Sequence, residues 1–110
     1  MHTDLQAFKA EFFRALAHPI RIRILECLGR REHSVQELQR RLEISQPVVS
    51  QQLAILRGKG IVASRKVGNT VRYELRDPRI MELLKTARAI FNSHLVGTRD
   101  MLKQLRREAR

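Results

Sequence analysis

The N-terminal part of the chain carries two predicted helices. Apolar side chains recur there every three or four residues, at Leu5, Phe8, Phe12, Phe13 and Leu16. This spacing predicts an amphipathic helix over about residues 4–16. Pro19 fits the first turn of a second helix, because the N–H that proline lacks has no helical partner there. Gly29 is predicted to end this helix, whose buried face is predicted to carry Ile20, Ile24, Leu25 and Leu28.

Two short helices joined by a tight turn are predicted next. Ser34 and Glu37 have the spacing of a capping box, in which the hydroxyl accepts from one backbone N–H and the carboxylate from another. The buried side of the helix that follows carries Val35, Leu38 and Leu42. After a turn at residues 43–44, Ser45 is placed to cap a further helix with Pro47 in its first turn. This helix is predicted to close at Gly58 and Gly60 and to bury Val49, Leu53 and Leu56.

The hydrophobic period then changes from helical to two. Residues 61–67 favour a strand, and Gly68-Asn69 favours a tight turn with positive φ. In the second strand the apolar positions are Val71, Tyr73 and Leu75, so we expect a hairpin with one apolar face. Asp77-Pro78 is predicted to open a last helix over about residues 78–108, which Gly97 could interrupt. Its seam alternates steps of four and three through Ile80, Leu84, Ala87, Phe91, His94, Thr98, Met101 and Leu105.

The order of these elements predicts the fold class. It is α-α-α-α-β-β-α, a mainly α fold of the α+β type with a β-hairpin wing. Two short helices followed by a hairpin form a winged helix-turn-helix, in which the second helix enters the major groove of DNA. We expect one such domain over residues 1–110, with the terminal helices, about 4–16 and 78–108, forming a dimer interface.

The proposed recognition helix is polar but uncharged. Its predicted non-core positions are Gln46, Val48, Ser50, Gln51 and Gln52, and no charged residue occurs from Ser45 to Leu56. Glutamine can form two hydrogen bonds with adenine, serine can reach several base edges, and valine can contact a thymine methyl. A carboxylate here would repel phosphate, so its absence suits a helix that enters a groove. A helical hairpin within another small bundle is the alternative.

The charge balance strengthens the nucleic-acid interpretation. The 110 residues include 22 Lys and Arg against 11 Asp and Glu, a net charge of +11. Such an excess suggests a polyanionic partner, with nucleic acid ahead of an anionic membrane surface. Between Arg57 and Arg76, six basic residues face Glu74 alone, as in a wing that contacts phosphates. The candidate DNA-binding residues are Ser45, Gln46, Val48, Ser50, Gln51, Gln52, Arg57, Arg65, Lys66, Asn69 and Arg72.

Other features narrow the function classes. We find no acid/base pair, nucleophile elbow or phosphate-cradling loop, so no enzyme and no catalytic residue is predicted. One cysteine, Cys27, excludes an intrachain disulfide framework. No apolar run approaches the roughly 20 residues that span a bilayer. The N-terminal residues 1–4 lack the pattern of a secretory signal. We therefore expect a cytoplasmic protein that binds double-stranded DNA and no membrane.

Three segments resemble the ArsR/SmtB-type winged-helix repressors. They are residues 12–25 (FFRALAHPIRIRIL), residues 45–56 (SQPVVSQQLAIL), and residues 60–62 with the wing that ends in Tyr73. The resemblance covers roughly residues 8–95. It implies a homodimeric bacterial repressor that leaves its operator when a metal or another inducer binds. It also implies dimer contacts through the first and last helices.

The chain departs from the metal-sensing patterns of that family. Ser34 and Gln36 stand where thiolate-sensing members carry a Cys-x-Cys pair, and neither can supply a soft anionic ligand. On the last helix, His94 is followed three residues later by Gly97, which does not complete the other known ligand pattern. No metal site and no cofactor is therefore predicted, and the inducer stays open. We interpret His18, His33 and His94 as structural or surface groups.

Three alternatives remain at this stage. Cys27 is interpreted as a small packed side chain, and a redox sensor that forms a disulfide between two subunits is the second interpretation. The whole protein could instead be an architectural protein that binds DNA without reading sequence. It could also be a protein-interaction module that uses its last helix. Equal affinity for operator and scrambled DNA would identify the architectural protein, and no duplex binding at low salt would favour the interaction module.

Overall fold

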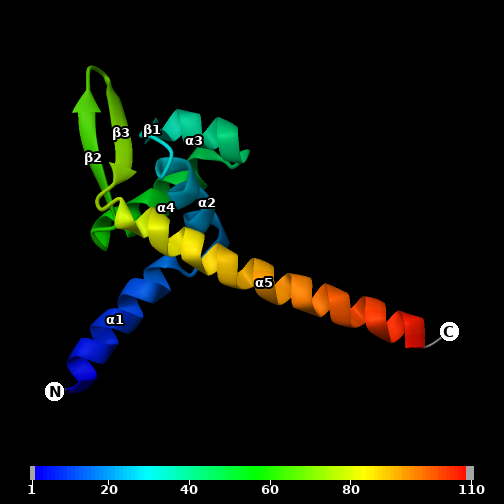
Figure 1. Ribbon diagram of the computed structural model, residues 1–110. Coiled ribbons are helices and arrows are strands. Elements are labelled where there is room, and N and C mark those ends of the chain that lie inside the picture. Colours follow the sequence, from blue (N-terminus) through cyan, green and yellow to red (C-terminus); the bar gives the residue numbers. More distant parts are fainter. Residues whose placement is uncertain (1, 109–110) are drawn as a thin grey trace. The chain divides into compact units, whose positions relative to one another are not determined.

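The structure is a computed structural model that describes residues 2–108, without the side chains of residues 2, 3, 95 and 96 (Figure 1). Residue 1, part of the predicted N-terminal pattern, and residues 109–110 lie outside that range. The chain divides into two compact units, with the boundary between Ile80 and Met81. The elements are α1 (His2–Leu16), α2 (Pro19–Leu28), β1 (His33–Ser34), α3 (Val35–Leu42), α4 (Gln46–Gly58), β2 (Val62–Val67), β3 (Thr70–Leu75) and α5 (Arg79–Glu108).

The predicted order lacked one strand. β1 pairs antiparallel with β3, His33 opposite Tyr73 and Ser34 opposite Arg72, and so forms the edge of a three-stranded sheet in the order β1-β3-β2. Two residues are too few for a period of two to be visible in the sequence. The strand exists because β3, about 40 positions away, supplies the hydrogen-bonding partner. The fold is a winged helix-turn-helix with this small extension of the wing.

Side chains fix the starts of the short helices. The His18 Nδ1 accepts a hydrogen bond from the Ile20 N–H at 3.1 Å, which caps α2. The capping box of α3 is formed as predicted: the Glu37 N–H donates to the Ser34 hydroxyl at 3.1 Å, and the Ser34 N–H donates to the Glu37 carboxylate at 2.9 Å. These bonds satisfy helix N–H groups that have no partner within the helix.

One predicted cap is wrong. Ser45 occupies the N-cap position of α4 in an extended conformation, but its side chain makes no capping hydrogen bond. An N-cap hydroxyl accepts from the second or third N–H of the helix. Pro47 is the second residue of α4 and has no N–H, so one of the two donors is missing.

The predicted helix stripes meet in the core of the first unit. α2, α3 and α4 pack against one another and bury Ile24, Leu25, Leu28, Leu38, Leu42, Val49, Leu53 and Leu56. Ile20 and Val35 were also predicted to be buried and are only half-buried. Ile61 and Val62 extend the core to the base of the wing. This core fixes α4 relative to α3 and the wing.

The wing is a regular antiparallel hairpin. β2 and β3 pair from Val62 opposite Leu75 to Val67 opposite Thr70. Gly68 has φ +62°, which favours glycine, whereas Asn69 does not have positive φ. Positive φ at the first central residue alone is the pattern of a type II′ turn, which suits the twist of a hairpin. Of the predicted apolar face, Tyr73 and Leu75 are half-buried and Val71 is exposed, so this face is covered only partly.

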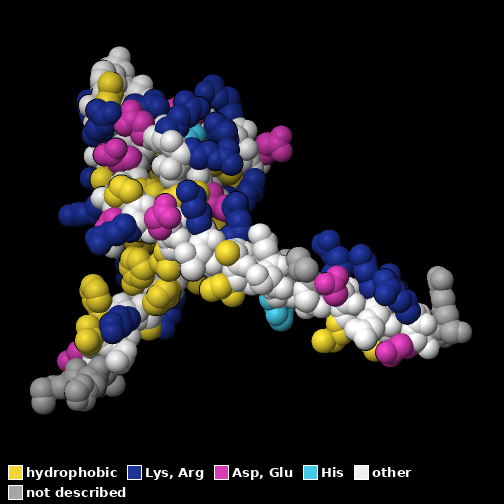
Figure 2. Space-filling model, viewed as in Figure 1, with side chains coloured by type: hydrophobic (Ala, Val, Ile, Leu, Met, Phe, Trp, Pro, Cys, Tyr) yellow, Lys and Arg dark blue, Asp and Glu magenta, His cyan; other side chains and the backbone are white. Residues whose placement is uncertain are grey.

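Both terminal helices expose large apolar side chains. On α1, Phe8 is 74% exposed, and Leu5 and Phe13 are also open to solvent (Figure 2). α5 runs without a break through Gly97, the position at which the sequence left an interruption open. Its exposed apolar side chains are Ile90, Phe91, Met101, Leu102 and Leu105. Within the described range, no helix is both long and apolar enough to span a bilayer.

Candidate nucleic-acid interface

The first turns of α4 present polar groups on an open surface. Gln46 and Gln51 are exposed, and Val48 and Ser50 are half-buried. The Gln46 amide nitrogen donates to the Ser50 hydroxyl at 2.6 Å, one helical turn further on. The hydrogen bond orders two of the predicted base-reading side chains before any ligand arrives. Because α4 carries no charge on this surface, nothing here repels a phosphate backbone.

Gln52 does not belong to that surface, contrary to the sequence prediction. It is only 8% exposed, and its amide oxygen accepts from the Arg21 guanidinium at 2.9 Å. Arg21 also donates to the carbonyl of Ala15 at 2.7 Å, at the C-terminal end of α1. Position 52 follows Val49 by three residues and therefore lies on the buried stripe of α4. Gln52 ties the recognition helix to the rest of the unit.

A polar depression of about 330 Å³ lies between the starts of α3 and α4 and the tip of the wing. It brings Gln46 and Asn69 to one site, although they come from different elements. The lining also includes Gln36 and Thr70, which were not among the predicted DNA-binding residues. Gln36 is exposed on the first turn of α3, so the helical phase of α3 could have indicated it. The full lining is Val35, Gln36, Gln46, Asn69, Thr70, Val71 and Tyr73.

Two cations, one on α4 and one on β2, are open to solvent. Arg57 at the end of α4 and Lys66 on β2 are exposed, and in the described part of the chain neither forms an ion pair. Figure 2 shows Lys and Arg side chains gathered over the wing and the helices beside it. Cations without a carboxylate partner are the groups that gain most from contact with phosphate.

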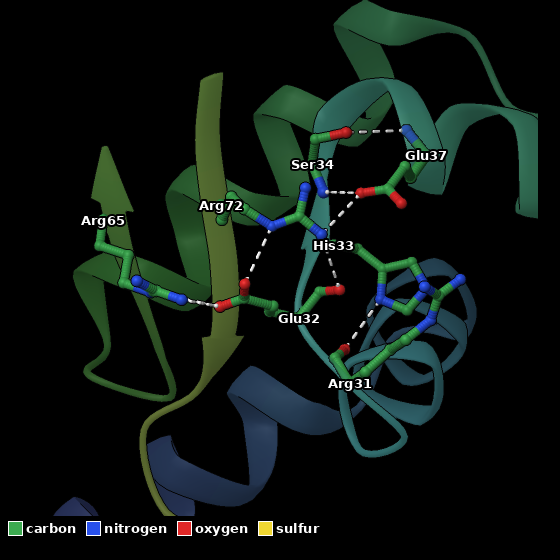
Figure 3. Close-up of polar contacts among 7 residues, drawn as sticks. All are labelled: Arg31, Glu32, His33, Ser34, Glu37, Arg65 and Arg72. Atoms are coloured by element: carbon green, nitrogen blue, oxygen red, sulfur yellow. Dashed lines mark hydrogen bonds and ion pairs between the residues drawn. The ribbon is translucent and has the colours of Figure 1, made fainter. Parts of the chain in front are cut away.

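Arg65 and Arg72 differ from these free cations. Both are ion-paired with Glu32, which lies between α2 and β1 (Figure 3). The Arg65 Nη2 lies 2.7 Å from Glu32 Oε2, and the Arg72 Nε lies 3.1 Å from Oε1. Arg72 also reaches Glu37 Oε1 at 3.0 Å. Both arginines are among the predicted DNA-binding residues, and in the structure the Glu32 carboxylate already holds both.

His18, His33 and His94 are structural or surface groups in the structure. His18 caps α2, and His94 is exposed on α5. His33 is fully buried; its Nδ1 lies 2.8 Å from the Arg31 carbonyl, and its Nε2 makes no hydrogen bond. Cys27 is half-buried and unpaired. Among the described residues, no three His, Cys, Asp or Glu side chains gather in a way that could hold a metal ion.

The environment of His33 predicts a pH-dependent stability. Burial lowers the pKa of His33 below its ordinary value of 6.5, with smaller effects from Arg31, Glu37 and Arg41. The unfolded chain therefore takes up a proton at a higher pH than the native protein does. The contribution of neutral His33 to the free energy of unfolding should be complete above about pH 6.5 and should be lost as the pH falls through the lower native pKa. Chemical denaturation between pH 7.5 and 5 measures this loss.

Two variants isolate the contribution of His33. His33→Asn should flatten the pH dependence in this window, because it removes the buried titrating ring. His94→Asn changes an exposed histidine and should leave the wild-type dependence in place. Glu32 and Glu37 do not titrate in this pH window, because neighbouring groups lower their pKa values below the ordinary 4.5. An unchanged slope in His33→Asn would contradict the prediction.

The geometry defines a winged helix-turn-helix transcriptional regulator. The model of the arsR family of bacterial regulatory proteins matches residues 18–64, which include α2, α3 and α4. An uncharacterized HTH-type transcriptional regulator of Mycobacterium tuberculosis, Rv0081, is 45% identical over 93% of this chain and 90% of its own length. Its crystal structure aligns with 84% of this chain and 94% of its own, with a TM-score of 0.78 and 46% identity. The chain belongs to the arsR family.

Two further relatives show the breadth of the similarity. The biofilm growth-associated repressor of Agrobacterium fabrum is 39% identical over 74% of this chain and 70% of its own length. A homodimeric winged helix-turn-helix DNA-binding domain of Mycobacterium bovis, Mb0332, shares the fold with a TM-score of 0.77 and 23% identity, covering 86% of this chain and 87% of its own. The family consists of regulators, so the predicted absence of enzymatic activity agrees with family membership.

Proposed function

We propose that this protein is a homodimeric repressor that binds an inverted-repeat operator in double-stranded DNA. The observation that carries the proposal is the surface of α4. Gln46 and Gln51 are exposed on an uncharged helix face, and Arg57 at the end of α4 and Lys66 on β2 are exposed cations without an ion pair among the described residues. Amide groups read base edges, and cations neutralise phosphates, so these residues supply both functions of a specific DNA-binding protein.

Other candidate DNA-binding residues from the sequence also have roles in this proposal. Ser45 and Ser50 supply hydroxyls at the start of α4, and Val48 supplies an apolar contact for a thymine methyl. Asn69, at the tip of the wing, contacts the sugar-phosphate backbone or the minor groove. Occupancy of a promoter then blocks transcription in the cytoplasm, where the chromosome lies. An inducer releases the protein by binding better to a conformation with lower affinity for DNA.

The experiment that tests this function is operator selection. The purified protein selects sequences from random duplexes, and its affinity for the selected site is compared with that for a scrambled duplex of the same length and composition. We expect an imperfect inverted repeat with half-sites about 34 Å apart, as two recognition helices related by two-fold symmetry require. Equal affinity for both duplexes would favour an architectural protein, and no binding at low salt a protein-interaction module.

The exposed terminal helices predict dimerisation. α1 leaves Phe8 74% exposed and α5 leaves Phe91 64% exposed within the single chain. A small monomer rarely keeps such apolar surface in water, and a symmetric partner can cover it. Sedimentation at micromolar concentration should give twice the chain mass of 12.9 kDa. Phe91→Glu should shift the protein towards the monomer, and wild-type protein of single chain mass would contradict the homodimer.

A further inference from the structure

The arginines of the wing form a like-charged pair. Arg65 on β2 and Arg72 on β3 are directly opposite each other in the hairpin register. Like charges in such a pair repel, because cross-strand neighbours are only about 5 Å apart. Glu32 is inserted between them and bonds one guanidinium with each carboxylate oxygen (Figure 3). The carboxylate is thus an internal counterion at a surface that faces DNA in the proposed function.

Arg72 is held more firmly than Arg65. Besides Glu32 Oε1, it bonds the Glu32 carbonyl at 3.3 Å and Glu37 Oε1 at 3.0 Å, and its side chain is 24% exposed. Glu37 is itself fixed by the Ser34 N–H in the capping box. These contacts join β3 to the start of α3. Arg72 is therefore a positioning residue that fixes the wing against the helix-turn-helix.

Arg65 has a single partner among these groups. Both of its hydrogen bonds, 3.2 Å and 2.7 Å long, end on the same oxygen, Glu32 Oε2, and its side chain is 57% exposed. Glu74 adds a weaker Coulombic attraction. A phosphate oxygen offers the same charge and hydrogen-bonding geometry as Glu32 Oε2. Arg65 can exchange one for the other without disturbing Arg72.

We propose that Glu32 acts as an internal substitute for DNA phosphate: it occupies Arg65 in the free protein and thereby sets the affinity of the wing for any duplex. This inference rests on the proposed DNA-binding function. Binding DNA through Arg65 replaces one ion pair by another, so the contact contributes little net affinity. Lys66, the next residue on β2, has no such competitor and contributes a full phosphate contact.

The decisive variant is Glu32→Gln. The amide keeps an oxygen for Arg72 but loses the charge that holds Arg65. Operator and scrambled duplexes should both bind about two- to fivefold more tightly, the range of an exposed ion pair. The plot of log affinity against log salt should steepen by about 0.9, the value of one additional phosphate contact. Glu82→Gln on α5 is the matched control, because it changes the net charge equally and should leave the salt slope unchanged.

A second substitution assigns the gain to Arg65. In the Glu32→Gln background, Arg65→Gln should abolish both the added affinity and the steeper slope. In the wild-type background, Arg65→Gln should lower the slope by less than Lys66→Gln does. This second comparison retains Glu32 and therefore remains decisive if Glu32→Gln does not fold. Thermal melting of each variant checks that the wing and core remain intact.

The outcomes separate this inference from the proposed function. Specific operator binding by the wild type, with Glu32→Gln no tighter than Glu82→Gln, overturns the inference alone. A gain that persists after Arg65→Gln also overturns it, as does weaker binding by a Glu32→Gln protein with unchanged melting. Failure of the wild type to bind any duplex at low salt overturns both.

Discussion

Replacing Gln51 with alanine is expected to weaken operator binding by about 1–3 kcal/mol, the contribution of one side chain that reads a base edge. Gln51 is exposed on the second turn of α4 and carries no charge. Its loss removes hydrogen bonds to bases and leaves phosphate contacts in place. Gln46→Ala should have a similar effect, which includes the loss of the hydrogen bond to Ser50. Each variant should relax base preference at one or two positions.

Lys66→Ala provides the contrast for these two variants. It should weaken operator and scrambled duplexes to a similar degree and lower the salt slope by about 0.9, since it removes charge without removing a base contact. Affinities for both duplexes at several salt concentrations separate the two classes of residue. If Gln46→Ala and Gln51→Ala weakened both duplexes equally, α4 would not be reading sequence.

Replacing Leu53 with alanine is expected to lower the free energy of unfolding by about 2–5 kcal/mol, the usual cost of a buried leucine truncation. Leu53 is 1% exposed and lies on the stripe of α4 that faces the core. The loss is large beside the total stability of roughly 5–15 kcal/mol that small domains have. Urea denaturation should show a lower midpoint at a fixed protein concentration, because dimerisation contributes to the measured stability.

The control for Leu53→Ala lies on the same helix. Ile55 is 37% exposed, so Ile55→Ala should change the unfolding free energy by well under half as much. Both variants carry the same change in helix propensity to within a few tenths of a kcal/mol. A loss for Leu53→Ala no larger than that for Ile55→Ala would show that α4 is not anchored through this stripe.

Most elements could be predicted because their causes are local. The stripes of α2 and α4, the capping box at Ser34 and Glu37, and the turn at Gly68 each depend on neighbours within a few residues. Helical periodicity and turn chemistry act over that distance. The uncharged surface of α4, with Gln46 and Gln51 on its exposed side, could be predicted for the same reason, because helical periodicity depends on residues a few positions apart.

The features that the sequence analysis missed depend on contacts between residues that are far apart in the chain. Gln52 can occupy a buried position of α4 as a polar side chain because Arg21, 31 positions earlier, donates a hydrogen bond to its amide oxygen. β1 exists because β3 supplies a pairing edge. Positive charge on the wing was visible in the sequence, but nothing local showed that Glu32 holds Arg65 and Arg72 across 33 and 40 positions.

The sequence by itself determined the succession of elements other than β1, the polar uncharged surface of α4 and the family resemblance, because propensities, periodicity and motif spacing are properties of short segments. Only the tertiary structure decided which cations are available to DNA. An ion pair depends on the distance between two groups in space, and folding brings together charges that are far apart in the chain. Lys66 and Arg65 are adjacent and both basic, yet among the described residues Arg65 pairs with a carboxylate from another segment and Lys66 does not.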